Sequence, residues 1–281
     1  MSSVLFDVPG PKARVRHGIL TVVVVLVFAG VAAWVLWVLW EKEQITPEKW
    51  APFTESVIIN LLLEGLLDTL LAAAAAIALA VVFGAVFASG RLSDHAWARW
   101  PSIAVIEFFR AVPLLLLILF LFFGFGSTLG TFWALVIGLT LYNGSVLAEI
   151  FRAGILSVPR GQSEAAYAVG MRKSQVMRLI LAPQALRSML PAIISQCVVA
   201  LKDTALGFVI GASGIVHDAE AIYIFPQYNN PLAVGIVLMA IFIAINYSLS
   251  KLAEYLESRL RREGKAVVLV GPAMDQTGGA L

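Results

Sequence analysis

The sequence predicts an all-α membrane protein with six transmembrane helices, and three observations carry this prediction. Of its 281 residues, 60% are hydrophobic and only 14% are charged, and the mean hydropathy is +0.88. Soluble domains carry about 25% charged residues. Six apolar segments are long enough to cross a bilayer, and the basic residues concentrate in alternate connections between them. A chain with this composition and pattern belongs in lipid.

The six apolar segments follow from the thickness of the bilayer. A hydrocarbon core about 30 Å thick needs roughly 20 apolar residues of helix. The segments that meet this requirement are residues 18–40, 65–89, 103–124, 131–150, 190–212 and 231–253. Pro101, residues 124–130, Pro191 and Pro231 lie at or near their ends. The first is too long for a signal-peptide core and has no small-residue cleavage site, so we expect a retained helix.

The positions of lysine and arginine predict the orientation, because basic residues that flank membrane spans are retained in the cytoplasm. With the N-terminus inside, sixteen of the twenty basic residues lie on the inner side. Both termini and the long segment 152–189 are then cytoplasmic, and the predicted outer loops 41–64 and 213–230 are mildly acidic. The sequence therefore predicts a multi-pass protein of the cell membrane.

Several classes of function lack the residues that they need. The net charge of +2 is too small and too dispersed for a nucleic-acid partner. Cys197 is the single cysteine, so an internal disulfide or a thiolate metal cage is excluded. His17, His95 and His217 fall in loops or at span edges, and no paired-histidine helix or nucleophile elbow accompanies them. We expect no catalytic site, metal or cofactor in this chain.

The basic segment between the fourth and fifth spans predicts two short cytoplasmic helices. Pro159 and Gly161 break the preceding helix, Ser163 is a candidate N-cap, and Glu164 then falls in a first turn, where the helix dipole favours a negative charge. Gly170 offers the left-handed conformation that ends a helix. A second, amphipathic helix is expected over roughly 172–182, before Pro183 leads back into the membrane.

Two interpretations of this segment stay open on physical grounds. Ala165, Ala166 and Ala168 leave one surface of the first short helix nearly free of bulky side chains. Such a helix, held by tight turns, suits a groove in a cytoplasmic partner and is able to transmit force. Alternatively, the segment is a linker whose basic residues satisfy the positive-inside rule.

The spacing of Glu164, Ala165, Ala166, Gly170, Ile180 and Pro183 resembles the EAA loop of type I ATP-binding-cassette (ABC) importer permeases. The spacing matches throughout; Ala182 departs from the leucine that this family has before the proline. The stretches Phe108–Pro113, Tyr142–Ile155 and Leu201–Thr204 are similar to the polar amino acid branch, although Ala111 and Val112 replace a glycine and a threonine. The resemblance covers residues 65–254.

The resemblance implies a division of the chain. The chain is expected to comprise a cytoplasmic segment 1–17, an extra N-terminal transmembrane helix 18–40, an outer loop 41–64, a five-helix permease domain 65–254 and a flexible cytoplasmic tail 255–281. The extra helix is similar to one that some glutamate importer permeases carry, which favours glutamate as the substrate. The residues that the resemblance assigns to ATPase coupling are Gly161, Glu164, Ala165, Ala166, Gly170, Ile180 and Pro183.

The resemblance also implies partners. They are a cytoplasmic ATP-binding subunit dimer that receives the short helix, a second permease subunit that is a distinct chain, and an extracytoplasmic substrate-binding protein. Transport then follows alternating access. The chain has no Walker A pattern, so the ATP is used by another polypeptide.

Ionisable residues at membrane depth are candidates for a translocation path or gate, because each costs at least roughly 2.5 to 3.5 kcal/mol to insert. Lys202 and Asp203, followed by Thr204, lie in the middle of the fifth span. They either meet the charged groups of a substrate or pair with a charge on another helix, for example Glu107, Arg110 or Glu149. Glu107 and Arg110 lie one helical turn apart, which predicts a structural pair or an inner gate.

The alternative function is an ion-gradient-driven secondary carrier, which also needs carboxylates within the membrane. Such carriers are usually built from inverted repeats with interrupted helices. The sequence has no convincing internal repeat, and a carrier has no need of the segment 161–183.

Overall fold

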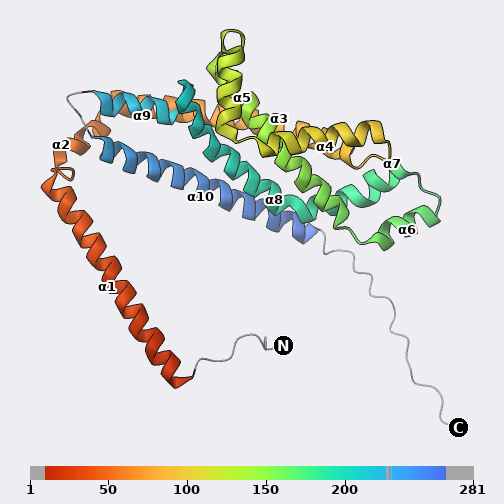
Figure 1. Ribbon diagram of the computed structural model, residues 1–281, viewed down its shortest axis with the longest axis horizontal. Coiled ribbons are helices and arrows are strands. Elements are labelled where there is room, and N and C mark those ends of the chain that lie inside the picture. Colours follow the sequence, from red (N-terminus) through yellow and green to blue (C-terminus); the bar gives the residue numbers. More distant parts are fainter. Residues whose placement is uncertain (1–9, 226–227, 229, 264–281) are drawn as a thin grey trace. The chain divides into compact units, whose positions relative to one another are not determined.

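The structure is a computed structural model that describes residues 10–225, 228 and 230–263 (Figure 1). This part of the chain is helical and contains no strand, as the sequence predicts. It divides into two compact units, one formed by Met1–Ile59 with Ile222–Ile236 and the other by Asn60–Ala221 with Val237–Leu281. Each unit is described by itself below.

Within the described residues, five helical segments are long and apolar enough to cross a membrane: Lys12–Glu41, Ser56–Arg91, Leu114–Leu156, Lys173–Ile210 and Pro231–Leu252. The predicted third span, 103–124, is divided between helix α4 (Ala96–Ala111) and helix α5 (Leu114–Leu156). Pro113 explains the break, because proline lacks an N–H and biases the preceding residue towards extended backbone. Val112 has φ −79° and ψ 127°.

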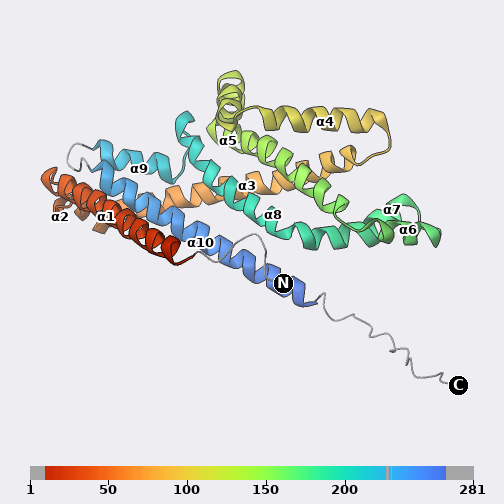
Figure 2. The same ribbon diagram turned by 60° about the horizontal axis from the view of Figure 1, so that its bottom comes forward.

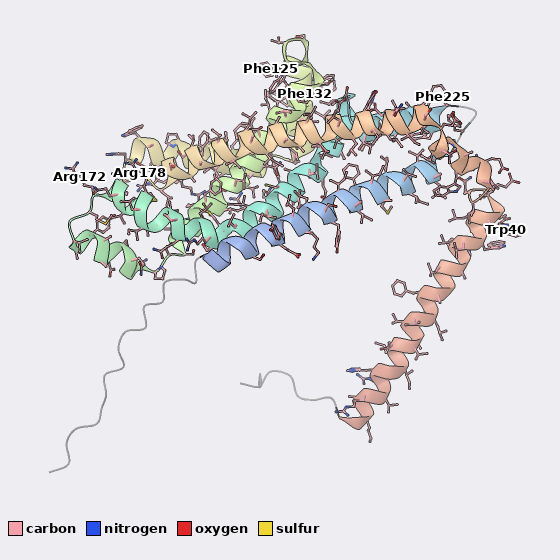
Figure 3. All side chains as sticks on the ribbon, turned by 180° about the vertical axis from the view of Figure 1, so that it is seen from behind. Trp40, Phe125, Phe132, Arg172, Arg178 and Phe225 are labelled. Carbon is pink, nitrogen blue, oxygen red and sulfur yellow. The ribbon has the colours of Figure 1, made fainter. Side chains whose placement is uncertain are left out.

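Helix α5 is a helical hairpin, so it accounts for more than one of the predicted spans. Gly130 has φ 70° and ψ 170°, which interrupts the helix. In a straight helix, residues 118 and 138 would be about 30 Å apart. Instead, a Cβ atom on Gly138 would lie 2.8 Å from Cγ1 of Ile118. The first arm, residues 114–129, therefore folds back on the second arm, residues 131–156, with Phe125 and Phe132 near the projecting tip (Figure 3).

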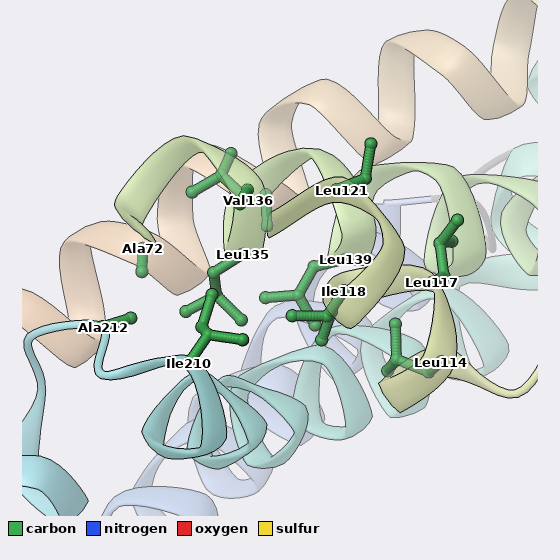
Figure 4. Packing of buried hydrophobic residues seen from close by; sticks show 12 residues of the cluster. Ala72, Leu114, Leu117, Ile118, Leu121, Leu135, Val136, Leu139, Ile210 and Ala212 are labelled. Atoms are coloured by element: carbon green, nitrogen blue, oxygen red, sulfur yellow. The ribbon is translucent and has the colours of Figure 1, made fainter. Parts of the chain in front are cut away.

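The main apolar core of the larger unit lies where this hairpin meets α3 (Ser56–Arg91) and the chain near residue 210. Ile118 of the first arm and Leu139 of the second arm are completely buried, and Leu135 is almost completely buried (Figure 4). Ala72 from α3 and Ile210 complete the contact. These positions follow one another at helical spacing along each arm, so one face of each arm forms the core.

Small residues set the distance between α3 and the second arm of α5. A Cβ on Gly84 would lie 2.9 Å from Cβ of Leu147 and 3.0 Å from the carbonyl oxygen of Gly144. Ala80, Ala88 and Ala148 are also buried in this larger unit. Small residues at helix crossings are typical of membrane proteins, since packing replaces the hydrophobic effect as the driving force between helices.

The chain from residue 173 to 210 forms one continuous helical run. It passes through α7 (Lys173–Gln175), the π-helix η2 (Val176–Leu181), α8 (Ala182–Asp203) and the 3₁₀ helix η3 (Thr204–Ile210). The helix expected over roughly 172–182 thus continues through Pro183 into the fifth span. The wider π-turn lies directly before Pro183, where a proline ring would otherwise clash with the preceding helical turn. Gly211, at φ 66°, ends the run before α9 (Ile215–Ile224).

The smaller unit contains the N-terminal helix α1 (Pro11–Glu41), whose apolar side chains are exposed in this chain, and the short helices α2 (Pro47–Trp50) and η1 (Ala51–Thr54). Within it, the Tyr228 hydroxyl donates to Glu55 Oε2 over 3.0 Å, and Asn230 Nδ2 donates to the Lys49 carbonyl over 2.8 Å. The outer segment near residue 50 is thus bound to the chain near residue 230.

Several element boundaries differ from the predicted ones. Helix α1 begins at Pro11 inside the predicted segment 1–17, and α3 begins at Ser56 inside the predicted loop 41–64. Helix α10 (Pro231–Glu263) continues into the predicted tail 255–281. Backbone hydrogen bonds hold a helix together beyond the apolar stretch that crosses the membrane, so hydropathy marks only its middle. Residues 1–9 and 264–281 lie outside the described part.

Candidate functional site

Helix α6 (Arg160–Ala168) is the predicted short helix between the second arm of α5 and α7 (Figures 1 and 2). It begins earlier than predicted: Pro159 is the N-cap, and Gly161 lies inside the helix. Ser163 is not the cap, because its Oγ donates to the Arg160 carbonyl over 2.8 Å. Glu164 consequently lies after the first turn, and its side chain is exposed.

The end of α6 agrees with the sequence. Gly170 has φ +83°, its N–H donates to the Tyr167 carbonyl, and the Met171 N–H donates to the Ala166 carbonyl. These two bonds form a Schellman motif, which satisfies carbonyls left open at a helix end. The chain therefore turns sharply after α6, and Tyr167 and Val169 stay largely exposed at its end.

The predicted small-residue surface of α6 is divided between two environments. Ala166 is buried, whereas Ala165 and Ala168 are exposed. The interior contacts of α6 are with η2, in which Val176 is fully buried, Ile180 is half-buried and Arg178 is exposed (Figure 3). Pro183, which follows η2, is exposed. One side of α6 thus packs against η2, while the other is exposed.

Polar contacts hold the α6–α7 segment to its surroundings. Lys173 forms an ion pair with Asp94, in the turn between α3 and α4. The hydrogen bond and charge of Lys173 lower the pKa of the Asp94 carboxyl. Gln184 Nε2 lies 3.4 Å from Gln162 Oε1, so α8 also contacts α6. The segment is held between two parts of the larger unit.

A chain of five alternating charges joins α3, α4 and the second arm of α5. Arg91 Nη1 lies 3.0 Å from Glu107 Oε1 and 3.0 Å from Glu149 Oε2. At one end, Arg110 Nη1 lies 3.5 Å from Glu107 Oε2, which confirms the predicted pair one turn apart. At the other end, Arg152 Nε donates to Glu149 Oε1 over 3.0 Å. We call Arg110, Glu107, Arg91, Glu149 and Arg152 the charge chain.

An open pocket of about 340 Å³ lies at the Arg110 end of the charge chain. It is lined by Glu107, Arg110, Ala111, Tyr142 and Val146. Its volume lies within the range of pockets that hold small molecules. A guanidinium, a carboxylate and a phenol at one pocket offer complementary partners to a molecule that carries both an acidic and an amino group.

The fifth span contributes a separate polar cluster. Asn143 of α5 is buried, and it accepts a hydrogen bond from Gln196 Nε2 at 2.6 Å. The half-buried Asp203 carboxylate also interacts with the Asn143 side chain. Lys202 is exposed, and Thr204 is buried with its hydroxyl donating to the Leu201 carbonyl over 2.6 Å.

The predicted site residues therefore separate into two groups. Glu107 and Arg110 lie together at the pocket, whereas Asp203 lies with Asn143 and Gln196. Among the described residues, Glu107, Arg110 and Glu149 form their ion pairs within the charge chain and none with Lys202 or Asp203. The pairing of Lys202 or Asp203 with one of these three residues is thus absent from this structure.

Sequence reasoning overlooked Arg91 and Gln196 as parts of these clusters. Arg91 looks like an ordinary basic residue at the end of a span, and it lies sixteen positions before Glu107 in the sequence. Gln196 lies 53 residues from Asn143. The sequence shows only that each polar group lies within or beside an apolar span. This indicates that the group has a polar partner, but it does not indicate which residue that partner is.

Comparison with known proteins decides the family. Residues 76–262 match the family described as the binding-protein-dependent transport system inner membrane component. The chain belongs to this permease family. The permease is 42% identical over 244 residues to the glutamate transport system permease protein GluD of Corynebacterium glutamicum, and the match covers 84% of the permease and 89% of that relative.

Other relatives agree. The permease is 32% identical over 211 residues to the glutamate/aspartate import permease protein GltK of Escherichia coli, across 70% of the permease and 92% of the relative. A solved amino acid ABC transporter with histidines aligns at a TM-score of 0.67 and 31% identity, across 72% and 94% of the two chains. The methionine ABC transporter MetNI shares the fold, with a TM-score of 0.64 at 21% identity across 74% and 99% of the two chains.

These comparisons confirm the predicted type I ABC importer permease of the polar amino acid branch. The permease is accordingly a multi-pass membrane protein and a component of an ABC transporter complex.

Proposed function

We propose that the permease forms part of the membrane pathway through which an ATP-driven importer takes up glutamate. The observation that carries the choice of substrate is the extent of the similarity to the glutamate permease of C. glutamicum. That match covers 84% of the permease, which is more than residues 76–262 of the family match. The likeness therefore includes parts of the chain outside the region that the whole family shares.

We assign the ATPase activity to a separate cytoplasmic subunit pair that receives α6. In this assignment the exposed side of α6, with Glu164, Ala165 and Tyr167, contacts the ATPase subunit. The ATPase movement reaches the membrane through the contacts of α6 with η2. In this assignment the ATP is used by the partner subunit.

The remaining partners complete the importer. They are a second permease subunit, which we take to be a distinct chain, and a substrate-binding protein that docks on the outer face. Both termini are cytoplasmic in this proposal, because that orientation places sixteen of the twenty basic residues inside. It also places α6 on the side where ATP is available.

We assign the translocation path to the two polar groups of the larger unit. The pocket with Arg110 and Glu107 suits the carboxylate and the amine of an amino acid. Asp203, with Lys202 and Thr204 beside it, forms the second group. Glutamate carries one more carboxylate than amine, so the exposed Lys202 supplies a further positive charge along the path.

The test of this function is purification of the tagged permease from membranes together with its partners, followed by ATPase and uptake assays in liposomes. We expect an ATP-binding subunit to co-purify, and we expect binding protein with glutamate to stimulate ATP hydrolysis and uptake. Stimulation by glutamine but not by glutamate would overturn the assignment of glutamate as the substrate. Uptake driven by an ion gradient without any ATPase partner would overturn the importer itself.

Glu164→Lys tests the assignment of α6. The change reverses a charge on the exposed side of α6, so we expect uptake to be abolished while the permease still inserts in the membrane. Glu48→Lys makes the same reversal at an exposed position of α2 and should transport normally. Normal ATP-driven uptake by the Glu164→Lys complex would contradict the coupling role.

A further inference from the structure

Arg91 is the central member of the charge chain, and its geometry differs from that of the other members. A single atom, Nη1, contacts Glu107 of α4 and Glu149 of α5 at 3.0 Å each. The two carboxylate oxygens are therefore within about 6 Å of each other. Without the guanidinium between them, two like charges would face one another at the point where α3, α4 and α5 meet.

The other two arginines do not replace Arg91. Arg110 contacts the far oxygen of Glu107, and Arg152 contacts the far oxygen of Glu149. The Oε2 atom of Glu149 is buried and accepts no hydrogen bond within the described chain, so Arg91 is the cation that compensates it. Without Arg91, this oxygen has no cation in contact with it, although Arg152 still pairs with the other oxygen of the partly buried Glu149 carboxylate.

The charge chain extends from the pocket to the end of α5 that leads into α6. At one end, Glu107 and Arg110 line the pocket. At the other end, Glu149 and Arg152 lie in the last turns of α5, which ends at Leu156 shortly before α6 begins at Arg160. Arg91 joins the two halves, although it is not itself a lining residue of the pocket.

We propose that Arg91 is a positioning residue that couples the pocket to the segment leading into α6. By holding Glu107 and Glu149 together, it makes the position of the pocket pair depend on the position of the second arm of α5. A movement received by α6 then changes the pocket, and a substrate in the pocket changes the readiness of α6 to move. This inference rests on the proposed function, because it needs an ATPase that acts through α6.

The test uses the complete complex in liposomes and measures the ratio of glutamate imported to ATP hydrolysed. In Arg91→Gln we expect this ratio to fall about tenfold or more, within the usual range for coupling between two sites. ATP hydrolysis should continue but respond less to binding protein and glutamate. A merely structural role would lower the amount of complex and leave the ratio unchanged.

Three further variants sharpen the result. Arg99→Gln removes the same charge from an exposed position of α4 and should keep the wild-type ratio. Arg91→Lys keeps the charge without the planar fork, so it should recover part of the ratio. If Arg91→Gln fails to assemble, the double variant Arg91→Gln with Glu149→Gln also removes the negative charge that would face Glu107; we expect this double variant to assemble and to remain poorly coupled.

A wild-type ratio in Arg91→Gln, or in the double variant where that is needed, would overturn the proposal. A double variant that also fails to assemble would do the same, because Arg91 would then serve folding. A failure of the proposed function looks different, since the wild-type complex itself would then lack an ATPase partner or a response to glutamate.

Discussion

At the scale of single residues, Gly170 decides how the chain leaves α6. Its φ of +83° is strained for any residue with a Cβ atom, and the Schellman hydrogen bonds depend on it. Gly161 lies in the same helix with ordinary helical backbone, and nothing lies within 4 Å of the position where its Cβ would be. An alanine should therefore strain the backbone at position 170 and fit without strain at position 161.

We expect Gly170→Ala to cost about 1–2 kcal/mol, the usual penalty for left-handed backbone. Because this turn sets the direction of α6, uptake per assembled complex should also fall. Gly161→Ala should leave the free energy of unfolding near wild type, since alanine favours a helix. Thermal unfolding and uptake assays measure the two effects. Equal behaviour of the two variants would show that the turn at Gly170 has no special role.

Asp218 of α9 illustrates an electrostatic constraint at a single residue. Burial raises the pKa of its carboxyl, the charge of His217 opposes this, and the carboxylates of Asp68 and Glu64 raise it further. Its Oδ2 lies close to Gly65, where a Cβ would be only 2.3 Å away. The charged form is therefore disfavoured in the fold.

The sign of the pH effect follows from linkage. A carboxyl whose pKa is higher in the folded state than in the unfolded state binds more protons when folded, so its cost to stability grows as pH rises from the unfolded pKa to the folded pKa. We expect the melting temperature of the wild-type complex to rise relative to that of Asp218→Asn as pH is lowered towards the ordinary carboxyl pKa of about 4. Parallel pH profiles for the two proteins would refute this.

At the scale of elements, the close crossing of α3 with the second arm of α5 depends on the absence of a side chain at Gly84. The neighbours of a Cβ on Gly84 would be a Cβ atom and a backbone oxygen, neither of which lies on a flexible chain end. The two helices would have to separate to admit even a methyl group. The charge chain spans the same helices, so the crossing also positions Arg91.

Gly84→Ala is therefore expected to destabilise the permease by about 1–3 kcal/mol, the usual cost of overpacking. Gly30→Ala makes the same change in α1, where nothing lies within 4 Å of the added atom in this chain. It should be neutral or slightly stabilising. The measurement is the unfolding temperature of each purified variant, and a Gly84→Ala protein as stable as Gly30→Ala would show that the crossing can relax freely.

At the scale of the whole molecule, the proposed orientation is directly testable because Cys197 is the single cysteine. In a Cys197→Ser background, Glu48→Cys and Ser174→Cys place one thiol at an exposed position on each predicted side of the membrane. An impermeant maleimide should label Glu48→Cys in intact cells, and Ser174→Cys only after the cells are opened. The reverse pattern would invert the topology and place α6 outside, away from ATP.

The sequence by itself determined the membrane class, the family and the short helix before the fifth span. These follow from composition, from segment length and from the local spacing of Glu164, Gly170 and Pro183, which all act within one stretch of chain. The end of α6 at Gly170 was predictable for the same reason, since left-handed backbone is a local property.

The break at Val112–Pro113 is also local, because proline biases the preceding residue towards extended backbone. The start of α6 at Arg160 and the helical run through Pro183 were not apparent from the residue pattern. The tertiary structure also decided which charges meet. Arg91, Glu107 and Glu149 come from three helices, and Asn143 and Gln196 come from two. The cost of burying a charge requires that a partner exist, but only the packing of helices distant in sequence selects which partner it is.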